Sequence, residues 1–240
     1  MRKISLFFIL FVLTLPSIGC RVDKASQHSS TMDESTTPAT EPQPAAPAPQ
    51  TASTVTDTRP VIACFGDSLT AGLGTDPGQS YPDYLQSDLD ARGYHYHVVN
   101  QGISGNTTKD GVDRINSVLA RHPYLVIVEF GGNDGLRGLP IADSRANLDR
   151  IVSKLKSSST KVILAGISLP PDYGPDYIKQ FTDTYTLLAA KYRVPLLPFL
   201  LQNVYGVPGM MQRDRTHATA AGNKIVAANL LPLVQPLLKK

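Results

Sequence analysis

The chain contains 240 residues, of which 23 are Lys or Arg and 20 are Asp or Glu, giving a formal net charge of +3. These charges are scattered along the sequence, and no basic stripe with interleaved aromatic residues is present. The composition therefore argues against nucleic acid as a partner.

The amino terminus resembles an export signal. Basic residues precede an apolar stretch over residues 4–15, which is shorter than the ~20 apolar residues that span a bilayer. Gly19 followed by Cys20 resembles a bacterial lipobox, so we predict a lipoprotein-type signal peptide over residues 1–20 and lipidation of Cys20. Arg21 is not the aspartate of an inner-membrane retention signal, so we expect an anchor in the outer membrane, facing the periplasm or the surface. Ordinary signal-peptidase cleavage, giving a soluble periplasmic or secreted protein, is the alternative.

The rest of the chain divides by composition into a linker and a domain. Residues 21–59 are dominated by Thr, Ser, Ala, Pro and Gln and cannot bury enough apolar surface to offset chain entropy, so we predict a disordered tether. Residues 60–240 have a length that suits one domain with a substantial core. Cys64 lies in an apolar run and has no disulfide partner if Cys20 is acylated, so we interpret it as a small buried hydrophobe.

Apolar runs alternate with amphipathic stretches throughout this domain. The runs predict strands at residues 61–65, 96–99, 125–130, 162–167 and 194–197. The amphipathic stretches predict helices at residues 82–92, 108–121, 142–156, 176–192 and 218–238. Such alternation implies right-handed crossovers and a parallel sheet with helices on both faces. We therefore predict an α/β fold, namely a three-layer αβα sandwich with a flavodoxin-like parallel sheet of five strands.

The carboxyl ends of successive strands in such a sheet meet at one crevice. Polar segments follow the predicted strands at residues 66–68, 102–106 and 131–134, and another lies in a late loop at residues 214–217. The first segment sets Ser68 at a strand-to-helix turn, which is a position for a nucleophile. Because a serine hydroxyl is a weak nucleophile at neutral pH, the other segments must supply a base, a group that orients it, and oxyanion donors.

The late loop offers the base. His217 can face Ser68 with one ring nitrogen while Asp214, three residues earlier, holds the other. A helix cap beside an exposed histidine is the alternative interpretation of this pair. The candidate oxyanion donors are the N–H groups of Ser68 and Gly105 and the side-chain amide of Asn133. The alternatives here are a tight turn for the glycine and a loop-stabilising hydrogen bond for Asn133.

These motifs together resemble the SGNH, or GDSL-type, hydrolases, and within them the bacterial thioesterase I and arylesterase group. The similarity covers most of residues 60–240, with family blocks at residues 66–70, 103–107, 131–138 and 214–217. The blocks imply Ser68, Asp214 and His217 as the catalytic residues. They imply Ser68, Gly105 and Asn133 as the oxyanion hole.

The sequence departs from the family pattern at one point in the site. Ala218 follows His217 where the family usually has proline, so we expect a looser loop around the base. Residues 169–174 also resemble a loop that borders the acyl site in the thioesterase I group. Tyr173 in this loop and the nearby Tyr177 either line an acyl pocket or pack as loop aromatics.

The resemblance implies a serine esterase that hydrolyses acyl esters through an acyl-enzyme. The expected substrates are aryl and alkyl esters, lysophospholipids or thioesters, and lipidated Cys20 would supply the contact with a membrane. We expect a monomer without cofactor or metal; His95 and His97 share a strand face, but two ligands make a weak site. The alternatives are a carbohydrate or peptidoglycan O-acetyl esterase and a non-catalytic surface binding lipoprotein.

Three carboxylates near these positions have structural interpretations. Asp67 and Asp134 adjoin the candidate site residues, and we expect each to cap a turn or to accept hydrogen bonds from backbone. Glu129 lies inside a predicted buried strand, where a partnered structural carboxylate is expected.

Overall fold

The computed structural model describes residues 57–240. The predicted signal peptide, Cys20 and the tether up to residue 56 lie outside the described residues. The sheet contains five parallel strands in the order β2-β1-β3-β4-β5. The strands are β1 (Val61–Gly66), β2 (His97–Gly102), β3 (Leu125–Glu129), β4 (Lys161–Ala165) and β5 (Leu196–Leu197). This order is that of flavodoxin-like doubly wound sheets.

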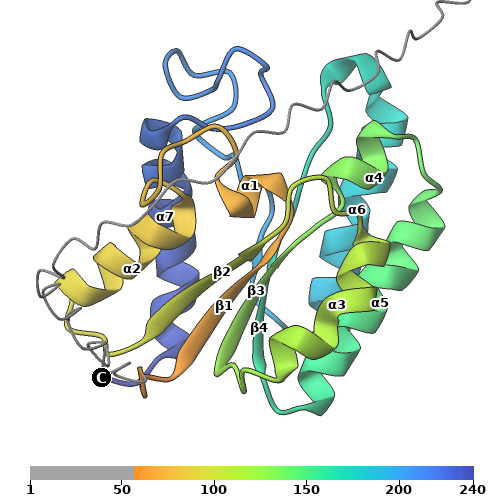
Figure 1. Ribbon diagram of the computed structural model, residues 1–240. Coiled ribbons are helices and arrows are strands. Elements are labelled where there is room, and N and C mark those ends of the chain that lie inside the picture. Colours follow the sequence, from red (N-terminus) through yellow and green to blue (C-terminus); the bar gives the residue numbers. More distant parts are fainter. Residues whose placement is uncertain (1–56) are drawn as a thin grey trace, which may run out of the picture. The chain divides into compact units, whose positions relative to one another are not determined.

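Helices cover both faces of the sheet (Figure 1). One face carries α2 (Tyr81–Ala91) and α7 (Ala220–Val234), and the other carries α3 (Thr108–Leu119), α5 (Ile141–Ser157) and α6 (Pro175–Tyr192). The predicted three-layer αβα sandwich is therefore confirmed. Among residues 57–240, no helix is both long and apolar enough to cross a membrane.

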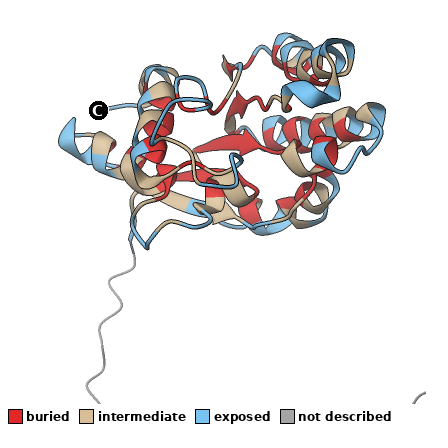
Figure 2. Ribbon diagram, turned by 90° about the horizontal axis from the view of Figure 1, so that it is seen from above, coloured by how far each residue is buried: buried red, intermediate tan, exposed pale blue. Residues whose placement is uncertain are grey.

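The core lies between the sheet and its two helical layers, as the buried residues in Figure 2 show. Every residue of β3 is buried, and so is β1 after its first residue, because helices cover both faces of these central strands. Cys64 is among the fully buried residues. It therefore packs as the small hydrophobe that we predict.

Short helical turns at the carboxyl edge of the sheet were not predicted as separate elements. They are α1 (Ser68–Ala71) and α4 (Gly132–Leu136), with a 3₁₀ turn at Pro171–Tyr173. The last helix is also shorter than predicted at both ends. It begins only after Thr219, which caps it, and a second 3₁₀ turn at Gln235–Leu237 follows its end at Val234.

Close backbone contacts hold α1 against the ends of two strands. A Cβ atom on Gly66 would collide with the Thr70 hydroxyl and with Glu129, and one on Gly102 would collide with the backbone of Ala71. Gly66 is paired with Gly102 on one side of β1 and with Glu129 on the other. The glycines therefore allow α1 to lie directly on the edge of the sheet where the polar segments meet.

Candidate active site

Ser68 is the first residue of α1, directly after strand β1. Asp67 precedes it as the helix N-cap, and its Oδ1 accepts a hydrogen bond from the N–H of Leu69 at 3.0 Å. The helix ends after one turn at Gly72, whose φ of 77° is left-handed. Because α1 has only four residues, its dipole contributes little to anion binding, and individual N–H groups matter more.

His217 lies between Ser68 and Asp214. Its Nε2 is 2.8 Å from Oγ of Ser68, and its Nδ1 is 2.7 Å from Oδ2 of Asp214. A carboxylate beside Nδ1 favours the tautomer that has its proton there, which leaves Nε2 free to accept the Ser68 proton. The structure therefore brings the three residues together in the order that the sequence analysis expected.

Asp214 is fixed by more than the histidine ring. Its Oδ1 accepts hydrogen bonds from the N–H groups of Thr216 at 2.9 Å and His217 at 3.1 Å. Partial burial alone would raise the pKa of Asp214, but the bonds from the His217 ring and these two N–H groups outweigh it and lower the pKa to about 2. Asp214 is therefore ionised at neutral pH and suited to stabilise a protonated imidazole.

The loop that carries His217 is held by a residue that the sequence analysis missed. The side-chain Nε2 of Gln212 donates to the carbonyl oxygens of Leu73 at 2.7 Å and Ala218 at 2.9 Å. The backbone N–H of Gln212 donates to the carbonyl oxygen of His217 at 2.8 Å. Ala218 is buried and pairs with Met211 in an isolated antiparallel bridge. The loop is thus tied to the segment after α1 by these bonds, without the proline of the family pattern.

Two of the candidate oxyanion donors have N–H groups without an acceptor in the part of the chain that the structure describes. None of residues 57–240 accepts a hydrogen bond from the N–H of Ser68 or of Gly105. Gly105 has a φ of 83°, a conformation that favours glycine, and its carbonyl accepts a hydrogen bond from Nη2 of Arg137 at 2.9 Å. The carbonyl is therefore fixed, and the N–H on the other side of the residue is available to a ligand.

Asn133, the third candidate donor, is the second residue of α4. Its Nδ2 donates to Oδ2 of Asp67 at 3.1 Å and to the carbonyl of Asn106 at 2.9 Å. Since an amide nitrogen carries only two hydrogens, both are already engaged. An oxyanion would have to share or replace one of these partners, which the residue types alone did not reveal.

Two buried carboxyl groups lie beneath this site. Asp67 is 2% exposed and Glu129 is fully buried. Oε2 of Glu129 accepts hydrogen bonds from the Asp67 N–H at 3.2 Å and from the Thr70 hydroxyl at 2.7 Å. Burial raises the pKa of Asp67 to about 6, and burial together with the neighbouring Asp67 raises the pKa of Glu129 well above its usual value. These groups therefore favour their neutral forms more than surface carboxyls do.

The segments that carry the site residues also carry exposed apolar side chains. Ile103 follows β2, Leu136 ends α4, and Tyr173 lies in the 3₁₀ turn. The Tyr173 hydroxyl donates to the Leu136 carbonyl at 3.0 Å, and its ring stacks on Tyr177 at 6.1 Å between centroids. Apolar surface of this kind suits a ligand with a hydrocarbon part.

The remaining candidates lie apart from this arrangement. Asp134 accepts hydrogen bonds from Thr108 and Ser144 in a structural contact between α3, α4 and α5. His97 begins β2, at the opposite edge of the sheet, where it pairs with Asp57 at 2.6 Å. Within residues 57–240 no group of three or more His, Cys, Asp or Glu side chains is placed to hold a metal ion.

Comparisons with known proteins give a consistent result. Residues 64–225 match the GDSL-like lipase/acylhydrolase family. Esterase TesA of Pseudomonas aeruginosa is 44% identical over 178 residues, covering 74% of this chain and 89% of that protein. Thioesterase 1/protease 1/lysophospholipase L1 of Escherichia coli K12 is 36% identical over 177 residues, covering 73% and 84%. The crystal structure of TesA has a TM-score of 0.72 and 43% identity and covers 74% of this chain and 99% of that chain.

Proposed function

Because the chain belongs to the GDSL-like lipase/acylhydrolase family, we propose that Ser68, His217 and Asp214 are the catalytic triad of a serine esterase. The observation that carries the proposal is the position of His217. Its two ring nitrogens lie 2.8 Å from the Ser68 hydroxyl and 2.7 Å from the Asp214 carboxylate. Both distances lie in the range required for proton transfer to a general base and for its orientation.

In the proposed reaction, Nε2 of His217 takes the hydroxyl proton while Oγ of Ser68 attacks the acyl carbonyl carbon. The tetrahedral intermediate collapses, and the imidazolium gives its proton to the leaving oxygen, so an alcohol or phenol departs and an acyl-enzyme remains. His217 next deprotonates a water molecule, which attacks the acyl carbonyl and releases the carboxylic acid with Ser68 regenerated. The Asp214 carboxylate stabilises the imidazolium in both halves of the cycle.

Negative charge on the carbonyl oxygen is proposed to be stabilised by three donors. These are the N–H groups of Ser68 and Gly105, which have no protein acceptor among the described residues, and the amide of Asn133. The Asn133 hydrogen bonded to Asp67 has the longer contact, 3.1 Å against 2.9 Å, and we expect this hydrogen to be shared between Asp67, which orients it, and the oxyanion. Loss of one such donor costs ~3 kcal/mol of transition-state stabilisation.

We propose aryl and alkyl esters, lysophospholipids and thioesters as substrates. The exposed apolar side chains of Ile103, Leu136 and Tyr173 suit an acyl chain better than they suit a sugar, which favours these substrates over carbohydrate O-acetyl groups. The names of the relatives, esterase and thioesterase 1/protease 1/lysophospholipase L1, support the same classes. A surface lipoprotein that only binds its ligand would not need His217 in contact with both Ser68 and Asp214.

Labelling with a fluorophosphonate probe tests this proposal. We expect one label per wild-type chain, none on Ser68→Ala, and full labelling of a control variant, Ser87→Ala, at an exposed serine of α2. Turnover of phenyl esters from acetyl to dodecanoyl should fall by roughly 10⁶ in Ser68→Ala. Retained turnover in this variant would refute the triad, and activity confined to acetyl esters would favour the O-acetyl esterase.

We also propose export with lipidation at Cys20. The support is the sequence of residues 1–20, which lies outside the described residues. Metabolic labelling with an alkyne fatty acid should tag the wild-type protein in the membrane fraction but not Cys20→Ser. Recovery of the native protein from the cytosol with Met1 retained would contradict export.

A further inference from the structure

We propose that Arg114 is a positioning residue. It fixes the relative positions of the three segments that carry the oxyanion donors. The inference rests on the proposed function, since it assigns the residue that places Ser68, Gly105 and Asn133 relative to one another. Arg114 lies on α3, outside every segment in which the family motifs occur. It does not touch the Ser68 hydroxyl, and its role would be exerted through backbone groups.

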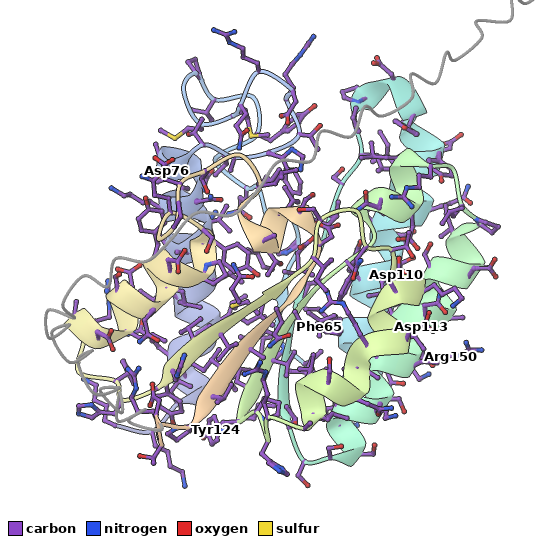
Figure 3. The ribbon with its side chains drawn as sticks, in the orientation of Figure 1. Phe65, Asp76, Asp110, Asp113, Tyr124 and Arg150 are labelled. Atoms are coloured by element: carbon purple, nitrogen blue, oxygen red, sulfur yellow. The ribbon has the colours of Figure 1, made fainter. Side chains whose placement is uncertain are left out.

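The guanidinium group of Arg114 is half-buried against two aromatic rings. Its Cζ lies 4.4 Å from the ring centroid of Phe65 and 5.4 Å from that of Phe130. The two rings contact each other edge to face, with 4.8 Å between centroids, and each stands at the end of a central strand. Figure 3 shows Phe65 on the side of the sheet that α3 covers. The side chain is therefore confined by the core and cannot relocate freely.

From this position the guanidinium donates hydrogen bonds in three directions. Nη2 bonds to the carbonyl of Gly66 at 2.6 Å, and Nη1 bonds to the carbonyl of Gln101 at 2.8 Å. Nε bonds to the side-chain oxygen of Asn106 at 2.7 Å. One planar group thus joins the carboxyl ends of β1 and β2 to the loop that follows β2.

Each oxyanion donor is connected to one of these acceptors. Gly66 lies two residues before Ser68 in the chain, and Asn106 directly follows Gly105. The carbonyl of Asn106 in turn accepts one of the two hydrogen bonds from Asn133. Arg114 consequently contacts two of the three donor segments directly and reaches the third through Asn106.

The helix that carries Arg114 is itself fixed beside the site. Thr107 caps α3 and forms a reciprocal capping box with Asp110, so the first turn begins directly after Asn106. Thr108 bonds to the buried Asp134, the residue after Asn133. The backbone at Arg114 is therefore held in place. Its guanidinium group can then set the distance between the ends of β1 and β2 and the loop after β2.

Lysine should not replace arginine in this role. A planar guanidinium offers donors in a fixed fork and stacks on aromatic rings, whereas an ammonium is a compact point charge. The Arg114→Lys variant keeps the charge but loses simultaneous contact with Gly66, Gln101 and Asn106. Arg114→Ala removes the contacts and leaves a slot between the rings and the carbonyls that a free guanidinium ion fits.

The experiment separates positioning from folding by counting reactive serines. Fluorophosphonate labelling gives the fraction of enzyme with a competent Ser68, and kcat is then expressed per labelled site. We expect Arg114→Lys and Arg114→Ala to label fully while kcat falls about 10- to 100-fold with KM changed less than ~3-fold. Affinity for an alkyl trifluoromethyl ketone, which forms an oxyanion adduct with the serine, should fall by a similar factor. Guanidinium chloride at ~20 mM should restore part of the kcat of Arg114→Ala, and equimolar urea should not.

A control and two contrary results complete the test. Arg150→Ala, at an exposed arginine labelled in Figure 3, should change none of these quantities. Unchanged kcat per labelled site in Arg114→Lys would overturn the positioning role. If Arg114→Ala does not fold, Arg114→Lys alone is sufficient for the test. Turnover that survives Ser68→Ala would instead refute the proposed triad, so the two failures are distinguishable.

Discussion

Asn133 donates a hydrogen bond from its side-chain amide to Oδ2 of the buried Asp67, 3.1 Å away. The same carboxyl group caps α1 through Leu69, so one side chain connects the helix that carries Ser68 to the helix that carries Asn133. Asp67 lies next to Ser68 in the chain but forms no bond to His217, and its role differs from that of Asp214. We expect it to orient the amide that stabilises the oxyanion.

Replacement of Asp67 by asparagine tests this role. Asparagine keeps the shape of the side chain but has one accepting oxygen in place of two, so Leu69 and Asn133 cannot both be bonded as before. We expect kcat with a phenyl ester to fall about 10- to 100-fold while KM changes little. Asp76→Asn, at an exposed carboxylate on the loop after α1 that Figure 3 labels, is the matched control and should keep full activity. Equal activity of both variants would show that Asp67 does not orient Asn133.

The sequence predicts the sheet and the positions of the site segments well, for a physical reason. Central parallel strands are buried on both faces, so β1 and β3 appear as continuous apolar runs whose ends can be located. The topology then brings the strand ends together, which predicts that Ser68, Gly105 and Asn133 lie at one edge of the sheet. The two-residue β5 and the one-turn α1 give weaker patterns, and their extents were not predicted.

The supporting contacts could not be predicted from the sequence. Gln212 reaches the carbonyl of Leu73 across 139 positions of the chain, and Arg114 reaches that of Gly66 across 48. Backbone carbonyls are present at every residue, so no side-chain pattern reveals which one a glutamine or an arginine will bind. The double engagement of the Asn133 amide is hidden for the same reason, because residue type gives its donors but not their partners.

The buried Asp67 should make stability depend on pH in a defined direction. Burial raises its pKa from an ordinary 3.8 to about 6, so between these values the folded protein binds more protons than the unfolded chain. The free energy of unfolding should therefore decrease as pH rises from ~4 to ~6. Asp67 is only 2% exposed, so solvent screens it little, and its contribution to the decrease is up to ~3 kcal/mol. Glu129, whose pKa is raised in the same direction, adds to the decrease.

Urea unfolding at intervals between pH 4 and 7 measures this dependence. Asp67→Asn should show a shallower decrease than the wild type, because its side chain does not titrate. Asp214, with a pKa lowered to about 2, stabilises the fold above ~4 and loses that contribution only at lower pH, so it does not mask the effect. Parallel pH profiles for the wild type and Asp67→Asn would contradict the assignment.

Glu129 should tolerate replacement by glutamine. Burial and the adjacent Asp67 raise its pKa well above the usual value, which favours the uncharged form of the carboxyl group. We expect Glu129→Gln to retain kcat within ~3-fold, since the side-chain oxygen can still accept from Thr70 and from the Asp67 N–H. Glu129→Ala should lose ~2–4 kcal/mol of stability in urea unfolding, because it leaves a cavity and unpaired donors. A large loss of kcat in Glu129→Gln, with folding intact, would show that the charged form is required.

Gln212 should control how often His217 is correctly placed. Its side chain bonds to Leu73 and Ala218, and so joins the loop of the base to the segment after α1. We expect Gln212→Ala to lower kcat/KM about 5- to 20-fold, since a base displaced by a fraction of an ångström transfers the proton less efficiently. Fluorophosphonate labelling should reach the same endpoint at a lower rate, because the serine remains but is activated less often. Gln202→Ala, at an exposed position of the preceding loop, is the control and should react as the wild type does. If Gln212→Ala labels at the wild-type rate, the main-chain bridge between Met211 and Ala218 alone is sufficient to hold the loop.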